Sequence, residues 1–544
     1  MKQIFYIALA GFLFSCNYKS KEADLVLHNA IIYTLDDNYP KAQAIAINAD
    51  TIVQVGAERD ILNTYKADRY IDCQGTYVYP GFIDAHCHFV RYGIGLQDLD
   101  LVGTKSWDEC LSKLKKYSEK YPGKKWINGW GWDQNDWQVK EFPNKEELDK
   151  LFPNKAVNLV RIDGHAAIVN QFLLDQVEIT IHSSWTGGEA LQTEDGKLTG
   201  VLIDNAMELV RANEPELSLA EMEEGLLIAQ KKCFAAGLTS VVDAGLSMNE
   251  VEMIQNLQGQ GKLKMQIYAM LSPSEEALEQ LKKGKIEEDR LTVRSVKLYG
   301  DGALGSRGAL LKKPYSDDHG KVGLMRELPE FYEEWAAYCK KYDFQLNTHC
   351  IGDAANAFIL EMYARHLKEM NDLRWRIEHA QVVDPEDMNL FNEFSIIPSV
   401  QPTHATSDMY WAEKRLGMFR MKGAYAYKSL LEKSGFIALG TDFPIEQIYP
   451  LETFYSAVFR QDKKGFPKDG FNNKESLTRI EALKGMTLWA ALANFEEKKK
   501  GSLEAGKQAD LTVLNADLNT IQKELFDEVE VLKTLVQGEI VYEK

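Results

Sequence analysis

The sequence predicts an α/β protein: a (β/α)₈ TIM barrel with a composite β-sandwich domain built from both termini and an insertion after barrel strand 1. Three observations support this prediction. The middle of the chain alternates apolar runs with helical stretches, both ends contain short strands separated by turns, and one interval between barrel strands is much longer than a βα unit requires. At 544 residues the chain exceeds what a single core usually supports, so we expect more than one domain.

Eight strand candidates lie in the middle of the chain, and a closed (β/α)₈ barrel requires this number. They are residues 78–84, 239–243, 265–271, 295–299, 345–349, 375–379, 395–400 and 436–441. Helical stretches separate them, which is typical of parallel strands. We therefore predict a barrel domain at 79–494.

Both ends of the chain read as short strands and turns rather than as βα units. The strand candidates there are residues 25–35, 44–55, 70–79, 509–514 and 531–542. We predict that the two ends form one composite β-sandwich domain, made of 23–78 plus 495–544.

An inserted subdomain is predicted at about 98–225, because about 150 residues separate the first two barrel strands. Five of the ten tryptophans fall between Trp107 and Trp137. Clustered tryptophans favour a core. An insertion that leaves the end of strand 1 nevertheless emerges on the face where barrels place their sites, so a role for some of them in a substrate cleft stays open.

The N-terminus reads as an export signal, with Lys2 before an apolar run at 4–14. This run is too short to span a bilayer. The residues that end at Cys16 resemble a bacterial lipoprotein box. We therefore predict lipidation of Cys16, a signal and tether at 1–22, and export to the bacterial cell envelope, with membrane contact only through the lipid. An ordinary cleaved signal is the alternative.

Charge and cysteine spacing exclude several classes of function. The net charge of −18 provides no basic surface for nucleic acid. The six cysteines after Cys16 lack Cys-x-x-Cys spacing, so disulfides are permitted but not required. Cys87 and Cys350 are strand neighbours of histidines, and we expect them to point into packing.

His86 and His88 are spaced two apart at the end of the first barrel strand. Residues i and i+2 of a strand point to the same side, so both rings can reach one metal ion. Such a pair alone is a weak signal, and a pair of structural histidines is the alternative. The pattern therefore has to be tested against the other strand ends.

Further polar residues lie at the ends of other barrel strands: Lys297, His349, His379 and Asp442. Histidines and carboxylates that converge from separate strands form a nitrogen and oxygen site suited to zinc or a similar divalent cation. The alternatives are core histidines and, for Asp442, a helix N-cap. Five other histidines have no such placement and are predicted to be structural or exposed: His28, His182, His319, His366 and His404.

Several motifs occur in an order that resembles the amidohydrolase superfamily, and within it the N-substituted formamide deformylase-like branch (amidohydrolase family 3). The motifs are Pro-Gly-Phe-Ile-Asp-Ala-His-Cys-His at 80–88, Gly-Trp-Gly-Trp-Asp at 129–133, Asp-Gly-His at 163–165, Lys-Leu-Tyr-Gly-Asp-Gly-Ala-Leu-Gly-Ser-Arg at 297–307, His-Cys-Ile-Gly-Asp at 349–353, Glu-His-Ala at 378–380, Gly-Thr-Asp-Phe-Pro at 440–444 and the segment 501–511. The resemblance covers nearly all of the chain after the signal. It departs from the family pattern at Val242, where the family commonly has His before the Asp that is Asp243 here, and at Ala303 of the strand-4 loop, where the family commonly has Ser.

The resemblance implies a hydrolase for amide-like C–N bonds with one or two divalent metal ions, most simply zinc. Carried over by position, the metal ligands are His86, His88, His349, His379 and Asp442. Lys297 matches a lysine that in many members is carbamylated (N6-carboxylysine) and bridges two metals. A plain Lys297 with one metal is the alternative.

The predicted mechanism uses a metal-activated water, with Asp442 as the general base and acid. The substrate is a small molecule, and candidate substrate contacts are Trp132, His165, Asp301 and Arg307. Arg307 could instead be a structural ion-pair partner. Two other functions stay open: a ligand-binding surface lipoprotein on a non-catalytic barrel, and a metal hydrolase for cyclic amides or esters. A homo-oligomer is also left open.

Overall fold

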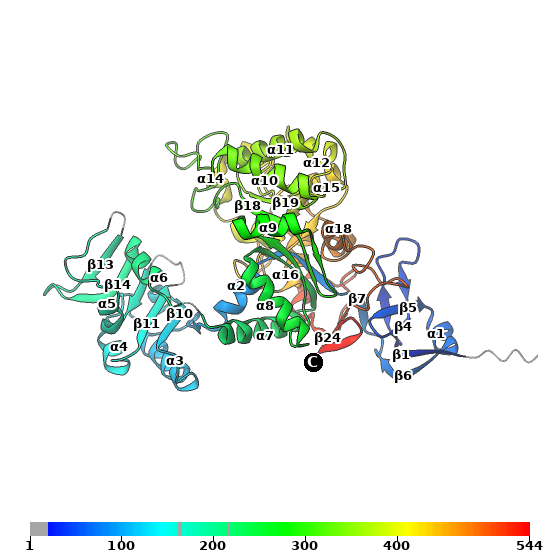
Figure 1. Ribbon diagram of the computed structural model, residues 1–544, viewed down its shortest axis with the longest axis horizontal. Helices are drawn as coiled ribbons and strands as arrows, with labels where there is room; N and C mark the ends of the chain where they lie inside the picture. The colour runs from blue at the N-terminus through cyan, green and yellow to red at the C-terminus, as the bar shows by residue number, and fades with distance from the viewer. Residues whose placement is uncertain (1–19, 162–165, 186–187, 216) are drawn as a thin grey trace, which may run out of the picture.

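The computed structural model describes residues 20–544 except 162–165, 186–187 and 216. Cys16 and His165 lie outside the described residues. Figure 1 shows the barrel in the middle of the molecule, a β domain on one side and the insertion on the other. Among the described helices, none combines the length and the apolar character that crossing a membrane requires.

Eight parallel strands form a nearly closed barrel, and each strand pairs with the next one in the chain. The strands are β8 (Phe82–Cys87), β15 (Leu238–Leu246), β16 (Gln266–Leu271), β18 (Leu291–Tyr299), β19 (Gln345–Cys350), β20 (Arg376–His379), β21 (Ile397–Val400) and β22 (Ala438–Leu439). A short ninth strand, β17 (Ile286–Glu287), pairs antiparallel with β18. This architecture confirms the predicted fold class.

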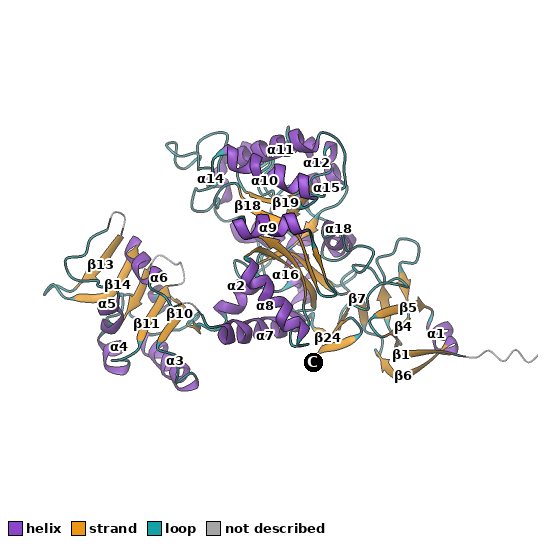
Figure 2. Cartoon of the chain, in the orientation of Figure 1, coloured by secondary structure: helices purple, strands orange, loops and turns teal. Residues whose placement is uncertain are grey.

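Helices surround the barrel sheet, as Figure 2 shows. They include α7 (Leu219–Ala235), α8 (Met248–Gly259), α9 (Glu275–Lys283), α10 (Pro329–Tyr342), α11 (Asp353–Leu367), α12 (Asn389–Glu393), α15 (Tyr427–Ser434), α16 (Pro450–Phe459), α17 (Arg479–Gly485) and α18 (Leu488–Ala493). Local sequence determines where several of them begin. Ser218 and Glu221 form a capping box at α7, and Ser247 and Glu250 form one at α8, which satisfies free N–H groups of each first turn.

The sheet path begins at β22 and ends at β8, and side chains close the seam between these two strands. The Asp84 carboxylate accepts hydrogen bonds from the Thr441 amide (3.0 Å) and hydroxyl (2.7 Å). The Asp442 amide donates to the His86 carbonyl at 2.8 Å. A Cβ at Gly440 would lie 2.5 Å from the His86 nitrogen, so only glycine fits there. The seam therefore places Asp442 beside the histidines of strand 1.

The predicted first barrel strand, 78–84, is split in the structure. Its first half belongs to β7 (Tyr77–Pro80), which pairs with β23 (Leu511–Leu514) of the terminal domain, and only the second half belongs to β8. Gly81 separates them, and a Cβ there would clash with Thr239 at 2.3 Å. A continuous apolar run does not reveal this change of sheet, because both strands are buried.

The two ends of the chain form the β domain together. A six-stranded sheet, in the order β25-β24-β23-β7-β2-β3, combines strands from both termini, and a four-stranded sheet, β5-β4-β1-β6, comes from the N-terminal part. A shared apolar core joins the two sheets and includes Leu25, Ile47, Val78, Leu511 and Leu535. The strands are β1 (Lys21–His28), β2 (Ile31–Tyr33), β3 (Lys41–Ala42), β4 (Ala44–Asn48), β5 (Thr51–Gly56), β6 (Tyr65–Asp72), β23 (Leu511–Leu514), β24 (Val531–Val536) and β25 (Glu539–Glu543).

The insertion has its own six-stranded sheet, in the order β13-β14-β12-β11-β10-β9, and its own apolar cores. Its elements are β9 (Leu99–Asp100), α3 (Trp107–Lys120), β10 (Trp126–Trp132), α4 (Glu146–Leu151), β11 (Ala156–Arg161), β12 (Ala166–Val169), α5 (Gln171–Gln176), β13 (Gly188–Gln192), β14 (Leu198–Asp204) and α6 (Glu208–Ala212). It connects to the barrel through α2 (Phe89–Gly95) and α7, which pack closely where Gly93 meets Gly225. The insertion is therefore a separately packed unit.

Candidate metal centre

His86 and His88 lie beside the Asp442 carboxylate. His86 is at the end of β8, and His88 is the N-cap residue of α2. The Oδ1 atom of Asp442 is 3.2 Å from His88 Nε2 and 3.7 Å from His86 Nε2. The two histidines that the strand spacing pairs therefore face the same carboxylate oxygen.

Glu378 holds the other ring nitrogen of His86. The Nδ1 atom of His86 is 2.5 Å from Glu378 Oε2, and both side chains are fully buried. Arg376 Nε lies 2.7 Å from the second carboxylate oxygen of Glu378. Burial alone would raise the pKa of Glu378, but Arg376 and His86 bring it down to about 2. The resulting anion accepts a hydrogen bond from the N–H at Nδ1, which leaves Nε2 of His86 free to ligate.

Lys297 of β18 is buried next to the same histidine, with its Nζ atom 3.1 Å from His86 Nε2. Burial lowers the pKa of Lys297 to about 8, although Glu378 and Asp442 oppose the shift. At neutral pH the amine therefore exchanges readily with its uncharged form. An uncharged amine is the form that adds carbon dioxide.

His379 and His349 extend the cluster across the barrel. Their ring centroids are 4.5 Å apart, and His379 is 4.9 Å from His86. Nδ1 of His379 lies 2.6 Å from Gln401 Oε1, an acceptor that keeps the proton on Nδ1. Burial, with a smaller contribution from the nearby Lys297, lowers the pKa of His349 to about 3. Burial also lowers the pKa of His379 well below its usual value. These rings are thus neutral at neutral pH, the state that binds metal.

His404 also belongs to this cluster, and its prediction as a structural or exposed histidine was wrong. It lies on α13 (Pro402–Asp408), directly after β21. Its Nε2 atom is 3.6 Å from Asp442 Oδ2, and its ring stacks on His379 at 5.8 Å. Strand 7 therefore contributes to the site as strands 1, 5, 6 and 8 do.

Asp442 is the carboxylate at the centre of the cluster. It is 5% exposed and has a φ of 63°, a left-handed conformation that non-glycine residues adopt mainly where the surroundings enforce it. Burial opposes ionisation of this group, but His88, His86, His379 and His404 together hold the pKa of Asp442 well below its usual range. It is therefore an anion that faces four imidazoles.

The arrangement of donor atoms fits divalent metal. Two groups have ligand atoms within 4.8 Å of one another, and Asp442 is common to both: one adds His86 and His88, the other His379 and His404. The buried Nε2 atoms of His349 and His404 have no hydrogen-bond partner among the described residues. Buried polar atoms normally have a partner, so a cation is a fitting occupant. His349 lies outside both groups.

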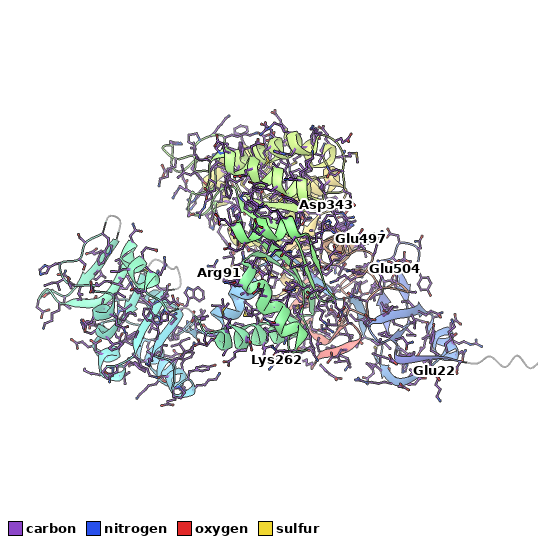
Figure 3. All side chains as sticks on the ribbon, in the orientation of Figure 1. Glu22, Arg91, Lys262, Asp343, Glu497 and Glu504 are labelled. Atoms are coloured by element: carbon purple, nitrogen blue, oxygen red, sulfur yellow. The ribbon has the colours of Figure 1, made fainter. Side chains whose placement is uncertain are left out.

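A pocket of about 390 Å³ opens onto these residues. His88, Lys297, His349, His379, His404 and Asp442 all line it. Its other walls include Tyr299, Trp411 and Glu446, and also Arg91 of α2, which Figure 3 labels between the barrel and the insertion. Apolar and polar walls around convergent ligands are typical of a small-molecule site.

Two of the predicted substrate contacts, Trp132 and Arg307, lie away from the pocket of the metal centre. Trp132 is fully buried in the insertion core, where its indole N–H donates to the Leu159 carbonyl at 2.7 Å. Arg307 forms an ion pair with Asp317 at 3.0 Å. Neither side chain lines the pocket of the metal centre. Trp132 is therefore a core residue of the insertion, and Arg307 is part of a structural ion pair.

Asp301 forms hydrogen bonds that fix the loops beside His349. Its carboxylate accepts hydrogen bonds from the backbone N–H groups of Leu310, Ile351 and Gly352, all at 2.8–2.9 Å. The loops after strands 4 and 5 are thereby tied together under His349, whose Nε2 lies 3.6 Å from Asp301. Asp301 therefore positions the pocket wall. Cys87 and Cys350 are buried in the apolar core with free thiols, as predicted.

Sequence reasoning missed His404 and Glu378 for different reasons. His404 follows the end of strand 7 by four residues, so the strand-end argument applied to that strand would have found it. Glu378 was hidden because adjacent strand residues normally point to opposite faces. His379 has a φ of 73°, which breaks this alternation and lets both neighbours reach His86.

Comparison with known proteins finds relatives along nearly the whole chain. Residues 69–542 match the amidohydrolase family model. A Bacillus subtilis protein named as an amidohydrolase, YtcJ, is 31% identical over 95% of this chain and 99% of its own length. An N-substituted formamide deformylase from Arthrobacter pascens is 26% identical over 96% and 98%. The crystal structure of an uncharacterized metal-dependent hydrolase from Pyrococcus furiosus superposes with a TM-score of 0.77 at 28% identity, over 91% of this chain and 100% of that one.

Proposed function

This chain belongs to the amidohydrolase family, and we propose that it is a metal-dependent hydrolase that cleaves an amide-like C–N bond of a small molecule. The observation that carries the proposal is the donor set around Asp442. Histidines and one carboxylate converge at the pocket, and buried ring nitrogens there have no protein partner among the described residues. A barrel that only binds a ligand has no need of this arrangement.

His86, His88 and Asp442 would hold one divalent cation, and His379 and His404 with the same carboxylate would hold a second. Nitrogen and oxygen donors of this kind suit zinc. A bound cation supplies Lewis-acid polarisation of a carbonyl and activation of water at neutral pH. Glu378 and Gln401 fix the orientation of His86 and His379 through their Nδ1 atoms.

Asp442 is the group in the pocket placed to move a proton. As an anion it accepts a proton from the attacking water, and it then delivers that proton to the leaving nitrogen. His88 and His404 lie 3.2 and 3.6 Å from its two oxygens, so they hold the carboxylate in place before the first proton transfer. Tyr299 and Trp411 line the pocket and would contact the bound substrate.

Lys297 is proposed to carry a carbamate when metal is bound. Its amine lies 3.1 Å from His86 Nε2 in a fully buried position, where an anion between two cations would be stabilised. Because its pKa is about 8, the uncharged and reactive fraction grows as pH rises through that value. Labelled bicarbonate added to the zinc-loaded protein at pH 8 should therefore give a carbamate carbon signal by NMR. The signal should be weaker at pH 6 and absent in Lys297→Met.

The proposed envelope location rests on Cys16. We propose that this residue is lipidated and anchors the exported protein. Expression with a labelled fatty acid should label the wild-type protein and leave Cys16→Ser unlabelled. Label on both proteins, or on neither, contradicts the proposal.

A hydrolysis screen with metal analysis tests the proposed reaction. The relative named as an N-substituted formamide deformylase makes N-formyl amines the first compounds to try, followed by other linear N-acyl amines, cyclic amides and lactones. We expect stoichiometric zinc or a similar cation, turnover of a linear amide, and loss of turnover with a chelator. Activity that survives complete removal of metal would refute the mechanism. Turnover confined to lactones would show that the enzyme cleaves an ester bond and not an amide-like C–N bond.

A further inference from the structure

A second pocket, of about 450 Å³, lies against the same helix that carries His404. Thr403, Thr406 and Ser407 of α13 line this second pocket, while His404 and Asp408 of the same helix line the pocket of the metal centre. The helix is therefore a wall between the two. Glu446 lines both pockets and accepts a hydrogen bond from Ser407 Oγ at 2.7 Å.

The second pocket is strongly acidic. Four carboxylates line it, against a single ammonium group: Glu446, Glu452, Asp462 and Asp527, against Lys463. Lys463 is already paired with Glu452 at 2.5 Å. Asp462 accepts backbone hydrogen bonds from Lys464 (2.8 Å) and Phe466 (2.9 Å) and is part of the local loop. Glu446 and Asp527 therefore leave negative charge that no lining cation neutralises.

Two buried polar atoms in the wall lack partners among the described residues, and both can accept a hydrogen bond: Gln461 Oε1 and Thr403 Oγ1. Gln461 is 2% exposed and Thr403 is 6% exposed. The amide nitrogen of Gln461 donates to the carbonyls of Pro467 (2.9 Å) and Lys468 (2.7 Å), which fixes the orientation of the amide. The free atom is thus an acceptor, and the group that would satisfy it is an N–H or O–H donor.

Aromatic rings form the rest of the wall. Tyr449, Tyr455 and Phe526 line the pocket, and the rings of Tyr455 and Phe526 are 5.1 Å apart. Burial raises the pKa of Tyr455, and the nearby charges of Asp527 and Asp462 raise it further. Ring faces beside carboxylates attract organic cations, since the ring quadrupole and the charges act together.

We propose that this second pocket binds an organic ammonium or guanidinium cation. Unneutralised carboxylates and ring faces border one cavity whose wall also contains two unpartnered acceptors, and an N–H-bearing cation complements this lining. Because Glu446 borders the metal centre, the cation is either the distal group of a bound substrate or a separate amine. The binding measurement itself does not depend on the proposed hydrolysis.

Protonated 2-phenylethylamine is a suitable probe, titrated by calorimetry into the full-length zinc-loaded protein. The isosteric neutral alcohol and the corresponding carboxylate serve as ligand controls. We expect the cation to bind at least about tenfold more tightly than either control, and more weakly at high salt. Equal binding of the alcohol would overturn the proposal.

Substitutions at the exposed rim locate the binding. Asp527→Asn should lower the affinity for the cation by about two- to fivefold, and Asp527→Lys should lower it by about tenfold or more. The matched control is Glu528→Gln, a neighbour in the same 3₁₀ helix that does not line the pocket and whose loss removes the same charge. If Asp527→Asn changed the affinity no more than Glu528→Gln does, the cation would be bound elsewhere and the proposal would fail.

Kinetics with a substrate from the hydrolysis screen then distinguish the two sources. If the cation raises the KM of substrates that carry a distal amine but not of uncharged ones, the pocket accommodates the substrate's own group. If KM is unaffected for both, the pocket binds a separate amine. Either result requires the binding established above, and failure to find any hydrolysed substrate leaves that binding result standing.

Discussion

The metal centre and the insertion show opposite relations between sequence and space. The residues of the centre are scattered: His86 and Glu378 are 292 positions apart and form a 2.5 Å contact. Five of the six tryptophans of the insertion are clustered between Trp107 and Trp137, and Trp132 and Trp137 are buried in a core of their own, with rings 5.9 Å apart.

The difference follows from topology. A parallel barrel brings the ends of all its strands to one face, so distant residues converge there. A sheet with its own helices must bury its own apolar surface, and large aromatic rings supply that surface locally. In this protein, clustering along the chain therefore indicates a core, whereas recurrence at strand ends indicates the site.

Asp442 provides the strongest test of this contrast. Asp442→Asn keeps an oxygen donor among the histidines, so it should retain zinc but lose about 10²–10⁴-fold in turnover, because the group that moves the proton is gone. His86→Ala should lose zinc as well as turnover. Metal analysis by mass spectrometry and turnover of the screened substrate measure both effects. Wild-type turnover in the Asp442→Asn variant would remove Asp442 from the mechanism.

Gln401 should have an intermediate effect. Gln401→Met removes the acceptor that holds His379 Nδ1 at 2.6 Å, and we expect zinc affinity to fall by about 10–100-fold. Gln401→Glu keeps an acceptor at this position and is the matched control. Competition with a zinc-binding dye measures the affinity. Equal loss in both variants would indicate packing damage instead of a lost hydrogen bond.

Trp132 tests the insertion side of the comparison. Trp132→Ala leaves a cavity in a closed core and should cost about 3–5 kcal/mol of stability in the insertion. Zinc content and KM of the folded protein should not change, because Trp132 does not line the site. Thermal unfolding and hydrogen exchange report the stability. A raised KM with unchanged stability would restore Trp132 as a substrate contact.

Arg307 should give the smallest effect. Its guanidinium pairs with Asp317, and Arg415 contacts the same carboxylate and can retain it when Arg307 is replaced. Arg307→Gln should therefore leave KM, turnover and zinc content at wild-type values in the same assays. A selective rise in KM would show that the strand-4 loop reaches the substrate.

Most of the fold and much of the candidate site could be predicted from the chain alone. Periodicity located the barrel strands, and the same strand-end argument located His86, His88, His349, His379 and Asp442 in one cluster. It failed at 78–84, where β7 changes into β8, because two buried strands in succession read as one apolar run. Sequence reasoning also did not show that Trp132 and Arg307 lie away from the pocket, because the position of a side chain there depends on which surface its segment packs against.

The sequence by itself determined which residue types stand at the strand ends, and therefore that nitrogen and oxygen donors would meet at one face of a barrel. Only the tertiary structure decided how they meet. The seam at Asp84 and Gly440 sets Asp442 against His86, and the left-handed backbone at His379 brings Glu378 to the same ring. The second, acidic pocket behind α13 also depends on three segments, 403–410, 446–463 and 526–529, that only folding brings together. Local pattern sets the direction of a side chain, but long-range packing sets its neighbours.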